Sequence, residues 1–292
     1  MNGTNDILDR LKGEIDQLTP QTAKAATYVL ENPSEVGLST IRELAEAAHV
    51  TPQTILRMAK QVGFDGYDDF RSPFRKALKE GTATFPDRAR WLQSIKAEGD
   101  LGGLYSEMLS YALSNIEETF ADISAQDLED AATTIWTARR VFTMGVGVNH
   151  ANASNFTYLA STGMTEFYAI PKQGSNATDD IAWADEQDVL IAITCKPYRA
   201  EVIEVVEHAR EQGMKIVAIS DSPASPIIRA ATHGFVIRAE TPQFFPSSVS
   251  TIALLETLLS FVIAVASPEI VTRVDRFHAR RHKIGLYNED PS

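Results

Sequence analysis

The stretch STIRELAEAAHVTPQTILRMAKQVGFDGYDDF, residues 39–70, decides the fold of the N-terminal part of this chain. Apolar side chains recur every three or four residues on both sides of His49-Val50, which predicts two short amphipathic helices joined by a tight turn. Thr51-Pro52 is a helix start signal, because threonine caps a helix and proline fits its first turn, and Gly63 is an end signal. This spacing predicts a helix-turn-helix within a small helical bundle.

The second predicted helix carries side chains of the kind that such a motif uses to contact DNA. Gln53, Thr54, Arg57 and Lys60 are expected on the face opposite the apolar stripe, with Thr51 at the start of the helix. Glutamine can pair with adenine and arginine with guanine, while a capping threonine and a lysine can contact phosphates. The alternative is that these side chains form the solvated face of an ordinary helical bundle.

Charge is distributed unevenly along the chain. The 292 residues include 27 Lys and Arg and 39 Asp and Glu, a formal net charge of −12, so the chain is not a general nucleic-acid binder. Residues 51–79 nevertheless hold six Lys or Arg and three Asp or Glu, a net of +3, which leaves −15 for the rest. A single basic segment on an acidic chain fits a localised DNA footprint.

Several features predict a protein of the cytoplasm. The one cysteine, Cys195, excludes an intrachain disulfide, and we expect it to be an inert, buried thiol. The first residues mix charged with apolar side chains and do not resemble a signal peptide. The most apolar run, Ile252–Ala266, contains Glu256 and is short for a bilayer span, so we expect no membrane association.

Four segments are predicted: an all-α DNA-binding domain over residues 1–80, a linker over 81–103, a second domain over 104–266 and a polar tail over 267–292. The linker is inferred from its glycines and proline. From residue 139 onward, short β-branched runs alternate with helical stretches, which predicts an α/β domain with a doubly wound, five-stranded parallel sheet and helices on both faces. Ligands of such sheets bind beyond the carboxyl ends of the strands. The predicted strands are Val141–Met144, Glu166–Ile170, Val189–Thr194, Lys215–Ser220 and Gly234–Arg238, followed by a final helix over 247–266.

The loop after the first predicted strand is a candidate ligand loop. It reads Gly145-Val-Gly147-Val-Asn149, and paired glycines let a ligand approach the backbone at the start of a helix. His150 follows, and no third glycine has the spacing of a dinucleotide-binding fingerprint, so no cofactor is expected. A tight strand-to-helix turn without a ligand is the alternative.

The motifs of residues 39–71 resemble the N-terminal domain of the RpiR family of bacterial regulators. The shared pattern is an Ile-x-x-Leu-Ala helix, a small-residue turn, a threonine cap, Thr-Ile-x-Arg in the second helix, and then Gly-Phe-x-Gly-Tyr and Phe. The matching residues are Ile41, Leu44, Ala45, Thr51, Thr54, Ile55, Arg57, Gly63, Phe64, Gly66, Tyr67 and Phe70. Family members carry a sugar isomerase (SIS) domain after the helix-turn-helix. The resemblance therefore implies DNA binding and an SIS-like second domain.

Compared with phosphosugar-binding SIS domains, this chain differs in the loop after the third strand. Their loop carries a Ser-x-Ser-Gly-x-Thr cradle for phosphate, whereas this chain has Thr194-Cys-Lys-Pro-Tyr-Arg199. Pro197 removes a backbone donor, while Lys196 and Arg199 add two cations. We therefore expect Lys196 and Arg199 to bind an anionic group, and the alternative is that both point to solvent.

The resemblance adds residues at two further places. Asn149 stands where the SIS pattern Gly-x-Gly-x-Ser has its serine, and the start of the last helix, which Ser247 or Ser248 is expected to cap, reaches the ligand in SIS domains. The complete predicted ligand-binding set is Gly147, Asn149, Thr194, Lys196, Tyr198, Arg199, Ser247 and Ser248.

The leading hypothesis is a non-enzymatic, ligand-responsive repressor or activator. Its expected partners are a duplex DNA operator, a small anionic metabolite (a sugar phosphate, a sugar acid or another organic anion) and further copies in a homodimer or homotetramer. A sugar-phosphate isomerase is the alternative, but it needs a positioned general base, and no carboxylate or histidine is clearly placed for that role. A binding module without DNA contact is a third possibility. His278 and His282 have a metal-like spacing, but a solvated basic tail explains them better, so no metal is expected.

Overall fold

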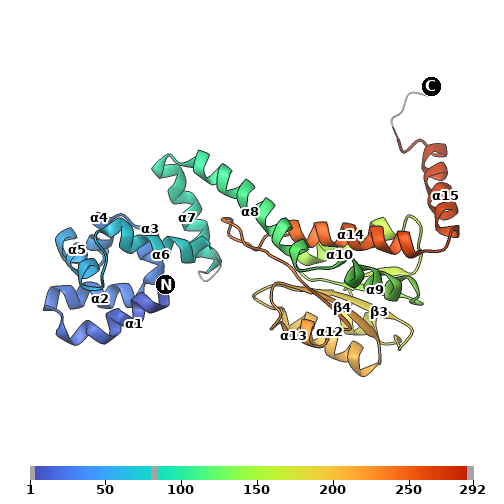
Figure 1. The fold of residues 1–292 in the computed structure, drawn as a ribbon, viewed down its shortest axis with the longest axis horizontal. Helices are drawn as coiled ribbons and strands as arrows, with labels where there is room; N and C mark the ends of the chain where they lie inside the picture. The colour runs from blue at the N-terminus through green and yellow to red at the C-terminus, as the bar shows by residue number, and fades with distance from the viewer. Residues whose placement is uncertain (1–3, 80–83, 288–292) are drawn as a thin grey trace. The chain divides into compact units, whose positions relative to one another are not determined.

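The computed structural model describes residues 4–79 and 84–287 (Figure 1). These residues form two compact units, one within residues 1–111 and 240–246 and the other within residues 112–239 and 247–292. The predicted boundary near residue 80 lies outside the described residues. The domain limits proposed from the sequence therefore stay a prediction.

All regular elements of the first unit are helices, as the sequence predicts, and the segment 240–246 adds no helix or strand. Helices α2, α4 and α5 surround a core built from the apolar stripes of all three, with Ala26, Leu44, Ile55 and Met58 fully buried. The elements are α1 (Thr4–Glu14), a 3₁₀ turn (Ile15–Gln17), α2 (Pro20–Glu31), α3 (Pro33–Leu38), α4 (Ile41–Ala47), α5 (Pro52–Gln61), α6 (Tyr67–Lys79), α7 (Phe85–Glu98) and the first part of α8 (Leu101–Ala121).

The short helix α3 begins at Pro33, directly after Asn32, where the sequence indicates only the end of the preceding helix. A helix this short leaves most of its carbonyls without intrahelical partners. Two side chains of α6 satisfy them: the Tyr67 hydroxyl donates to the Ser39 carbonyl at 2.8 Å, and Arg71 Nε donates to the Gly37 carbonyl at 3.2 Å. Arg71 is buried by this contact, so one of the six cations of the basic segment is not at the surface.

Helix α7 occupies most of the interval predicted to be a linker. Pro86 lies in its first turn, where a missing N–H costs nothing, and Gly99 ends it in a left-handed conformation with φ of 78°. Its residue Trp91 is buried, and its first residue Phe85 stacks on Phe245 with ring centroids 4.3 Å apart. Within the predicted linker, residues 85–98 are therefore helical, because these breaker residues mark the two ends of a helix.

The second unit contains a five-stranded, fully parallel sheet with strand order β2-β1-β3-β4-β5. The strands are β1 (Val141–Met144), β2 (Phe167–Ile170), β3 (Val189–Ile193), β4 (Lys215–Ser220) and β5 (His233–Val236). The central strand β3 is buried along its whole length, as expected for a parallel strand covered on both faces. The predicted doubly wound sheet is confirmed, with strand ends displaced by one or two residues.

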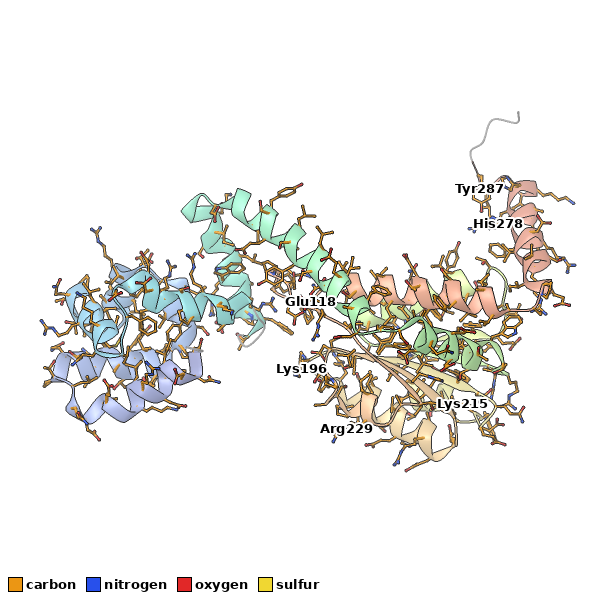
Figure 2. All side chains as sticks on the ribbon, viewed as in Figure 1. Glu118, Lys196, Lys215, Arg229, His278 and Tyr287 are labelled. Carbon is orange, nitrogen blue, oxygen red and sulfur yellow. The ribbon has the colours of Figure 1, made fainter. Side chains whose placement is uncertain are left out.

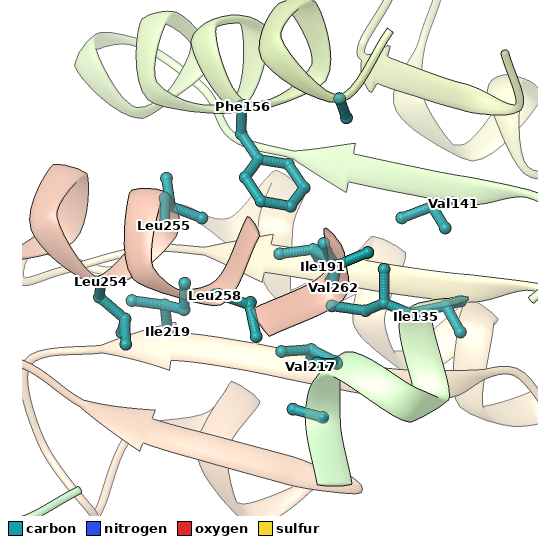
Figure 3. Close-up of a cluster of buried hydrophobic side chains, with 14 of the residues drawn as sticks. Ile135, Val141, Phe156, Ile191, Val217, Ile219, Leu254, Leu255, Leu258 and Val262 are labelled. Carbon is teal, nitrogen blue, oxygen red and sulfur yellow. The ribbon is translucent and has the colours of Figure 1, made fainter. Parts of the chain in front are cut away.

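Helices cover both faces of this sheet (Figure 1). One face is covered by α9 (Ala125–Trp136), α10 (Val148–Ala160) and α14 (Val249–Val265), and the other by α11 (Ala177–Asp180), α12 (Ala200–Glu211) and α13 (Pro226–Arg229). In the first layer, Leu254 and Leu258 of α14 pack with Ile219 and Val217 of β4 (Figure 3). The helices that follow β1 and β3 lie on opposite faces, so the chain changes direction between these neighbouring strands, which is where such sheets bind ligands.

The predicted polar tail contains a further helix, α15 (Glu269–Lys283). It packs through buried Ile270 against Gly163, where an added Cβ would lie 2.8 Å from Ile270 Cδ1. Within the described residues, no single helix is long and apolar enough to cross a membrane; α14 and α15 meet that test only together, and they meet at an angle of 119°.

Candidate functional site

Helix α5 is firmly capped at its start. The Thr54 N–H donates to Thr51 Oγ1 at 3.3 Å, the two hydroxyls lie 3.0 Å apart, and Pro52 lies in the first turn. The preceding helix α4 begins with a reciprocal pair, in which the Glu43 carboxylate accepts the Thr40 N–H at 2.7 Å and the Thr40 hydroxyl accepts the Glu43 N–H at 3.3 Å. These caps fix where both helices begin, which a recognition helix requires.

Three of the predicted DNA-binding side chains share one exposed face of α5. Gln53, Arg57 and Lys60 are spaced by four and then three residues, so they lie in line along the helix, and all three are exposed. Within the part of the chain that the structure describes, neither Arg57 nor Lys60 has an intramolecular ion pair. This face therefore presents two uncompensated cations and an amide to solvent.

Thr54 does not lie on that face. It precedes Met58 by four residues and is therefore on the buried side of α5, with 9% of its surface exposed. Its hydroxyl pairs with Thr51 instead, so the structure corrects the prediction that Thr54 faces outward. Thr51 itself is exposed at the helix start.

The glycine loop of the second unit is shaped by close packing at the end of β1. An added Cβ at Gly145 would lie 2.3 Å from the Asn149 carbonyl oxygen, so only glycine fits there. Gly147 precedes α10 with φ of 61°, a conformation that favours glycine, and it is exposed. The side-chain oxygen of Asn149 accepts from the Asn152 amide at 3.1 Å. The loop thus leaves backbone groups accessible at the start of a helix.

In the loop after β3, the Thr194 side chain is buried and hydrogen-bonded within the loop. Thr194 is 1% exposed, and its hydroxyl accepts the Arg199 N–H at 3.3 Å. The prediction that this hydroxyl faces a ligand is therefore not met in this structure, because the hydroxyl fixes the turn into α12. Cys195 is largely buried, and burial raises the pKa of its thiol to about 12, with nearby Asp221 adding to the effect, so the thiol is inert.

The two predicted cations of this loop differ in their surroundings. Lys196 is exposed, and its backbone N–H donates to the Asp221 carboxylate at 3.3 Å. The Arg199 guanidinium already pairs with Glu201 at 2.9 Å, with both side chains more than half exposed. Figure 2 shows Lys196 and Lys215, which begins β4, at opposite ends of the sheet. Lys196 thus lies at the carboxyl edge, as predicted.

The start of α14 carries more hydroxyls than the sequence analysis considered. Ser247 Oγ accepts the Val249 N–H at 3.3 Å, while Ser248 makes no side-chain capping bond. Ser250, in the first turn, is completely buried and its hydroxyl has no hydrogen-bond partner among the described residues. The Tyr198 hydroxyl is likewise buried without a partner there. A buried, unpaired hydroxyl is a signal that only a structure provides, because a serine within an apolar run has no distinctive pattern.

A hollow of about 440 Å³ lies elsewhere, beside β5. Its charged groups already have partners, since Arg238 pairs with Asp122 at 3.0 Å and His233 Nε2 lies 2.9 Å from the Thr134 hydroxyl. Burial lowers the pKa of His233. This hollow offers no unpaired charge to an anion, and it lies away from the ends of β1 and β3, so the loops described above are the better site.

Comparison with known proteins agrees with both units. Residues 5–81 match the helix-turn-helix domain of the rpiR family, and residues 134–264 match the SIS domain. An HTH-type transcriptional regulator of Caldanaerobacter subterraneus is 23% identical over 274 residues, which cover 89% of this chain and 90% of the relative.

Two solved structures share the fold. NanR of Vibrio vulnificus, in complex with ManNAc-6P, is 20% identical with a TM-score of 0.58, covering 97% of this chain and all of that one. The sugar isomerase domain of an RpiR transcription factor from Sphaerobacter thermophilus is 25% identical with a TM-score of 0.56, covering 61% of this chain and 98% of that one.

A helix-turn-helix unit joined to an SIS unit defines a class of transcriptional regulators. The two family matches together span more than half of the chain, and this chain belongs to the RpiR family of HTH-type transcriptional regulators.

Proposed function

We propose that this regulator reads operator DNA with the exposed face of α5 and that an anionic metabolite, bound at the carboxyl edge of its sheet, alters that binding. The observation that carries the DNA half is the alignment of Gln53, Arg57 and Lys60 on a helix whose start is fixed by Thr51. Gln53 and Arg57 contact base edges in the major groove, while Thr51 and Lys60 contact phosphates. Thr54 supports the cap and does not face the DNA.

The proposed effector carries a phosphate, carboxylate or sulfonate group. Lys196 attracts it, Arg199 grips it after leaving Glu201, and the first turn of α14 supplies helix N–H groups beside Ser248 and the unpaired hydroxyl of Ser250. Leaving Glu201 costs little, because an exposed ion pair contributes about 0–1 kcal/mol. The NanR complex with ManNAc-6P supports a phosphosugar among the candidates.

The proposed mechanism is allosteric and non-enzymatic. Effector binding favours one arrangement of a homodimer or homotetramer and so changes the spacing of two recognition helices relative to their half-sites. Both carboxylates that contact the loop after β3 already have partners: Asp221 accepts the Lys196 N–H, and Glu201 pairs with Arg199. Interconversion of a ketose phosphate and an aldose phosphate by the purified protein would contradict a purely regulatory role.

The DNA half is tested with the duplex upstream of the protein's own gene. We expect a salt-sensitive mobility shift that Arg57→Ala weakens by a factor of about 10 or more, since a good base contact contributes about 1–3 kcal/mol. Arg229→Ala, which removes an exposed arginine from the second unit, is the matched control and should leave the shift unchanged. Equal affinities of the wild type and Arg57→Ala would refute the assigned face.

The effector half is tested by thermal-shift screening of phosphosugars, sugar acids and small sulfonates, beside neutral sugars. Stabilisation by an anion should be lost in Lys196→Ala and Arg199→Ala but kept in the matched control Lys215→Ala. Glu201→Gln frees Arg199 and should tighten binding up to about fivefold, the equivalent of an exposed ion pair. Stabilisation by neutral sugars alone would overturn the proposal.

A further inference from the structure

Helix α15 carries a stripe of cations that neither half of the proposed function uses. Arg273, Arg276, Arg280 and Lys283 are separated by three, four and three residues, so they lie along one face of the helix, and all four are exposed. Within residues 4–79 and 84–287, no ion pair involves Arg276, Arg280 or Lys283. The stripe is therefore a row of solvent-facing positive charges.

A neighbouring face of α15 packs against the rest of the unit and fixes this orientation. Ile270 is buried against Gly163, where only glycine allows so close an approach. One turn from the helix end, Arg281 donates to the Tyr158 hydroxyl at 2.8 Å and lies 5.1 Å from the centroid of the Phe277 ring. Figure 2 shows α15 with its labelled His278 and the nearby Tyr287. With both ends of one face anchored to α10 and its C-terminal turn, the cationic stripe is held outward.

The charge of this helix is unusual for the chain. Residues 273–283 contain five Lys or Arg and one Asp, a net of +4 in a chain of −12. The segment 51–79, which holds the recognition helix, has a net of +3, and its Arg71 is buried. Cations in the last turn of a helix are favoured by its dipole, which accounts for Arg280 and Lys283 but not for Arg273 and Arg276, one to two turns earlier.

We infer that the α15 stripe is a second DNA-binding surface, which contacts the phosphate backbone of the duplex that the regulator binds. Duplex DNA is the polyanion that a helix-turn-helix regulator meets, and arginine fits phosphate with two parallel hydrogen bonds. From Arg273 to Lys283 the stripe is about 15 Å long, and about four phosphates of one DNA strand occupy that length. Such contacts add affinity without reading sequence.

The test compares two triple variants with identical changes in composition. Arg276→Ala/Arg280→Ala/Lys283→Ala removes the stripe, and Arg210→Ala/Lys215→Ala/Arg229→Ala removes two exposed arginines and one exposed lysine elsewhere on the same unit. Alanine favours helix, so α15 should remain folded. Binding of the full chain to a labelled duplex about four turns long is followed by fluorescence anisotropy between about 50 and 200 mM salt.

We expect the α15 variant to lower the slope of log affinity against log salt by about 3, because each phosphate contact contributes about 0.9, while the control variant keeps the wild-type slope. Equal slopes for wild type and the α15 variant, or an equal loss in both variants, would overturn the inference. If the slope were unchanged, two further measurements on the α15 variant would show what the stripe binds in place of DNA. A lower oligomer mass by light scattering would assign the stripe to contact with a second copy of the chain. Loss of binding to phosphatidylserine vesicles would assign it to a membrane surface. If wild type binds no duplex, the proposed function fails first, which separates the two outcomes.

Discussion

Asp188 should be the most sensitive single position in the second unit. It precedes β3 and is completely buried. Its carboxylate accepts five hydrogen bonds: from Nε of Arg139 at 3.0 Å, from Nε of Arg140 at 3.1 Å, from Nη2 of each arginine at 2.6 Å, and from the Asp185 N–H at 3.0 Å. Asp188→Asn replaces one acceptor oxygen with a donor and removes the anion that the two guanidiniums share, which leaves only Asp185 beside Arg139.

The expected cost follows from this geometry. Removing one partner from a buried ion pair costs about 3–5 kcal/mol, and for a unit of this size each kcal/mol lowers Tm by about 2–4 °C. We therefore expect Asp188→Asn to lower Tm by about 10 °C in differential scanning fluorimetry at neutral pH. Asp185→Asn is the matched control, because Asp185 is 40% exposed and pairs with a single arginine, Arg139, at 2.8 Å, a surface pair that contributes about 0–1 kcal/mol.

The pH dependence gives a sharper test. Burial tends to raise the pKa of Asp188, but the hydrogen bonds from Arg139 and Arg140 outweigh it and hold the pKa well below the usual aspartate range. A carboxylate with a lowered pKa in the folded state contributes its full stability above the unfolded-state pKa near 3.9, and this contribution is lost as pH falls further. The Tm difference between wild type and Asp188→Asn should thus be constant between about pH 8 and pH 5. A difference that grows as pH falls across that range would refute the reasoning, because a folded-state pKa raised by burial makes protonation stabilise the wild type.

Three further substitutions test the packing behind the sites. Gly145→Ala places a Cβ 2.3 Å from the backbone oxygen of Asn149, so the loop must shift; we expect a loss of about 1–3 kcal/mol in thermal melts and weaker effector binding, and an unchanged Tm would contradict the close approach. Tyr67→Phe removes the donor to the Ser39 carbonyl and should cost about 1–3 kcal/mol, seen as faster hydrogen exchange in α3 and α6; unchanged exchange there would argue against this bond. Gly163→Ala places a Cβ 2.8 Å from Ile270 Cδ1 and 2.9 Å from Val274 Cγ2, both on α15, so it should leave the sheet intact while raising hydrogen exchange in α15, and full protection of α15 would show that this contact does not anchor it.

The sequence alone was sufficient where local signals decide the structure. The five strands were found because strands covered on both faces are continuous apolar runs, as in Val189–Ile193. The start of α5 was predicted because threonine followed by proline is a local signal for the beginning of a helix. Thr54 was misplaced although the information was local: it precedes Met58 by four residues, and that spacing puts both on one face.

Helix α7 shows the opposite case. Its glycine and proline neighbours suggested a linker, and its packing depends on a segment more than 150 residues later in the chain. Phe85 stacks on Phe245, and the Arg88 side chain donates to the Thr241 carbonyl. No pattern within residues 81–103 encodes these partners, since they belong to the segment that connects β5 to α14. The formation of α7 is thus determined by residues within and beside it, whereas its burial depends on residues far away in the sequence.

The proposed effector site includes features that the local sequence predicts and features that depend on distant contacts. The sequence supplies the residue types of the loops, and their place at the carboxyl edge follows from the order of strands and helices. The sequence does not show which hydroxyl groups form hydrogen bonds within the fold itself. The Thr194 hydroxyl accepts the Arg199 N–H, and the Arg199 guanidinium pairs with Glu201. The Ser250 hydroxyl is buried and has no hydrogen-bond partner among the described residues. A buried hydroxyl without a hydrogen-bond partner costs free energy, and the proposed anion at the start of α14 would offset that cost. The strongest indication of a ligand at this edge is therefore a residue that the sequence analysis did not select.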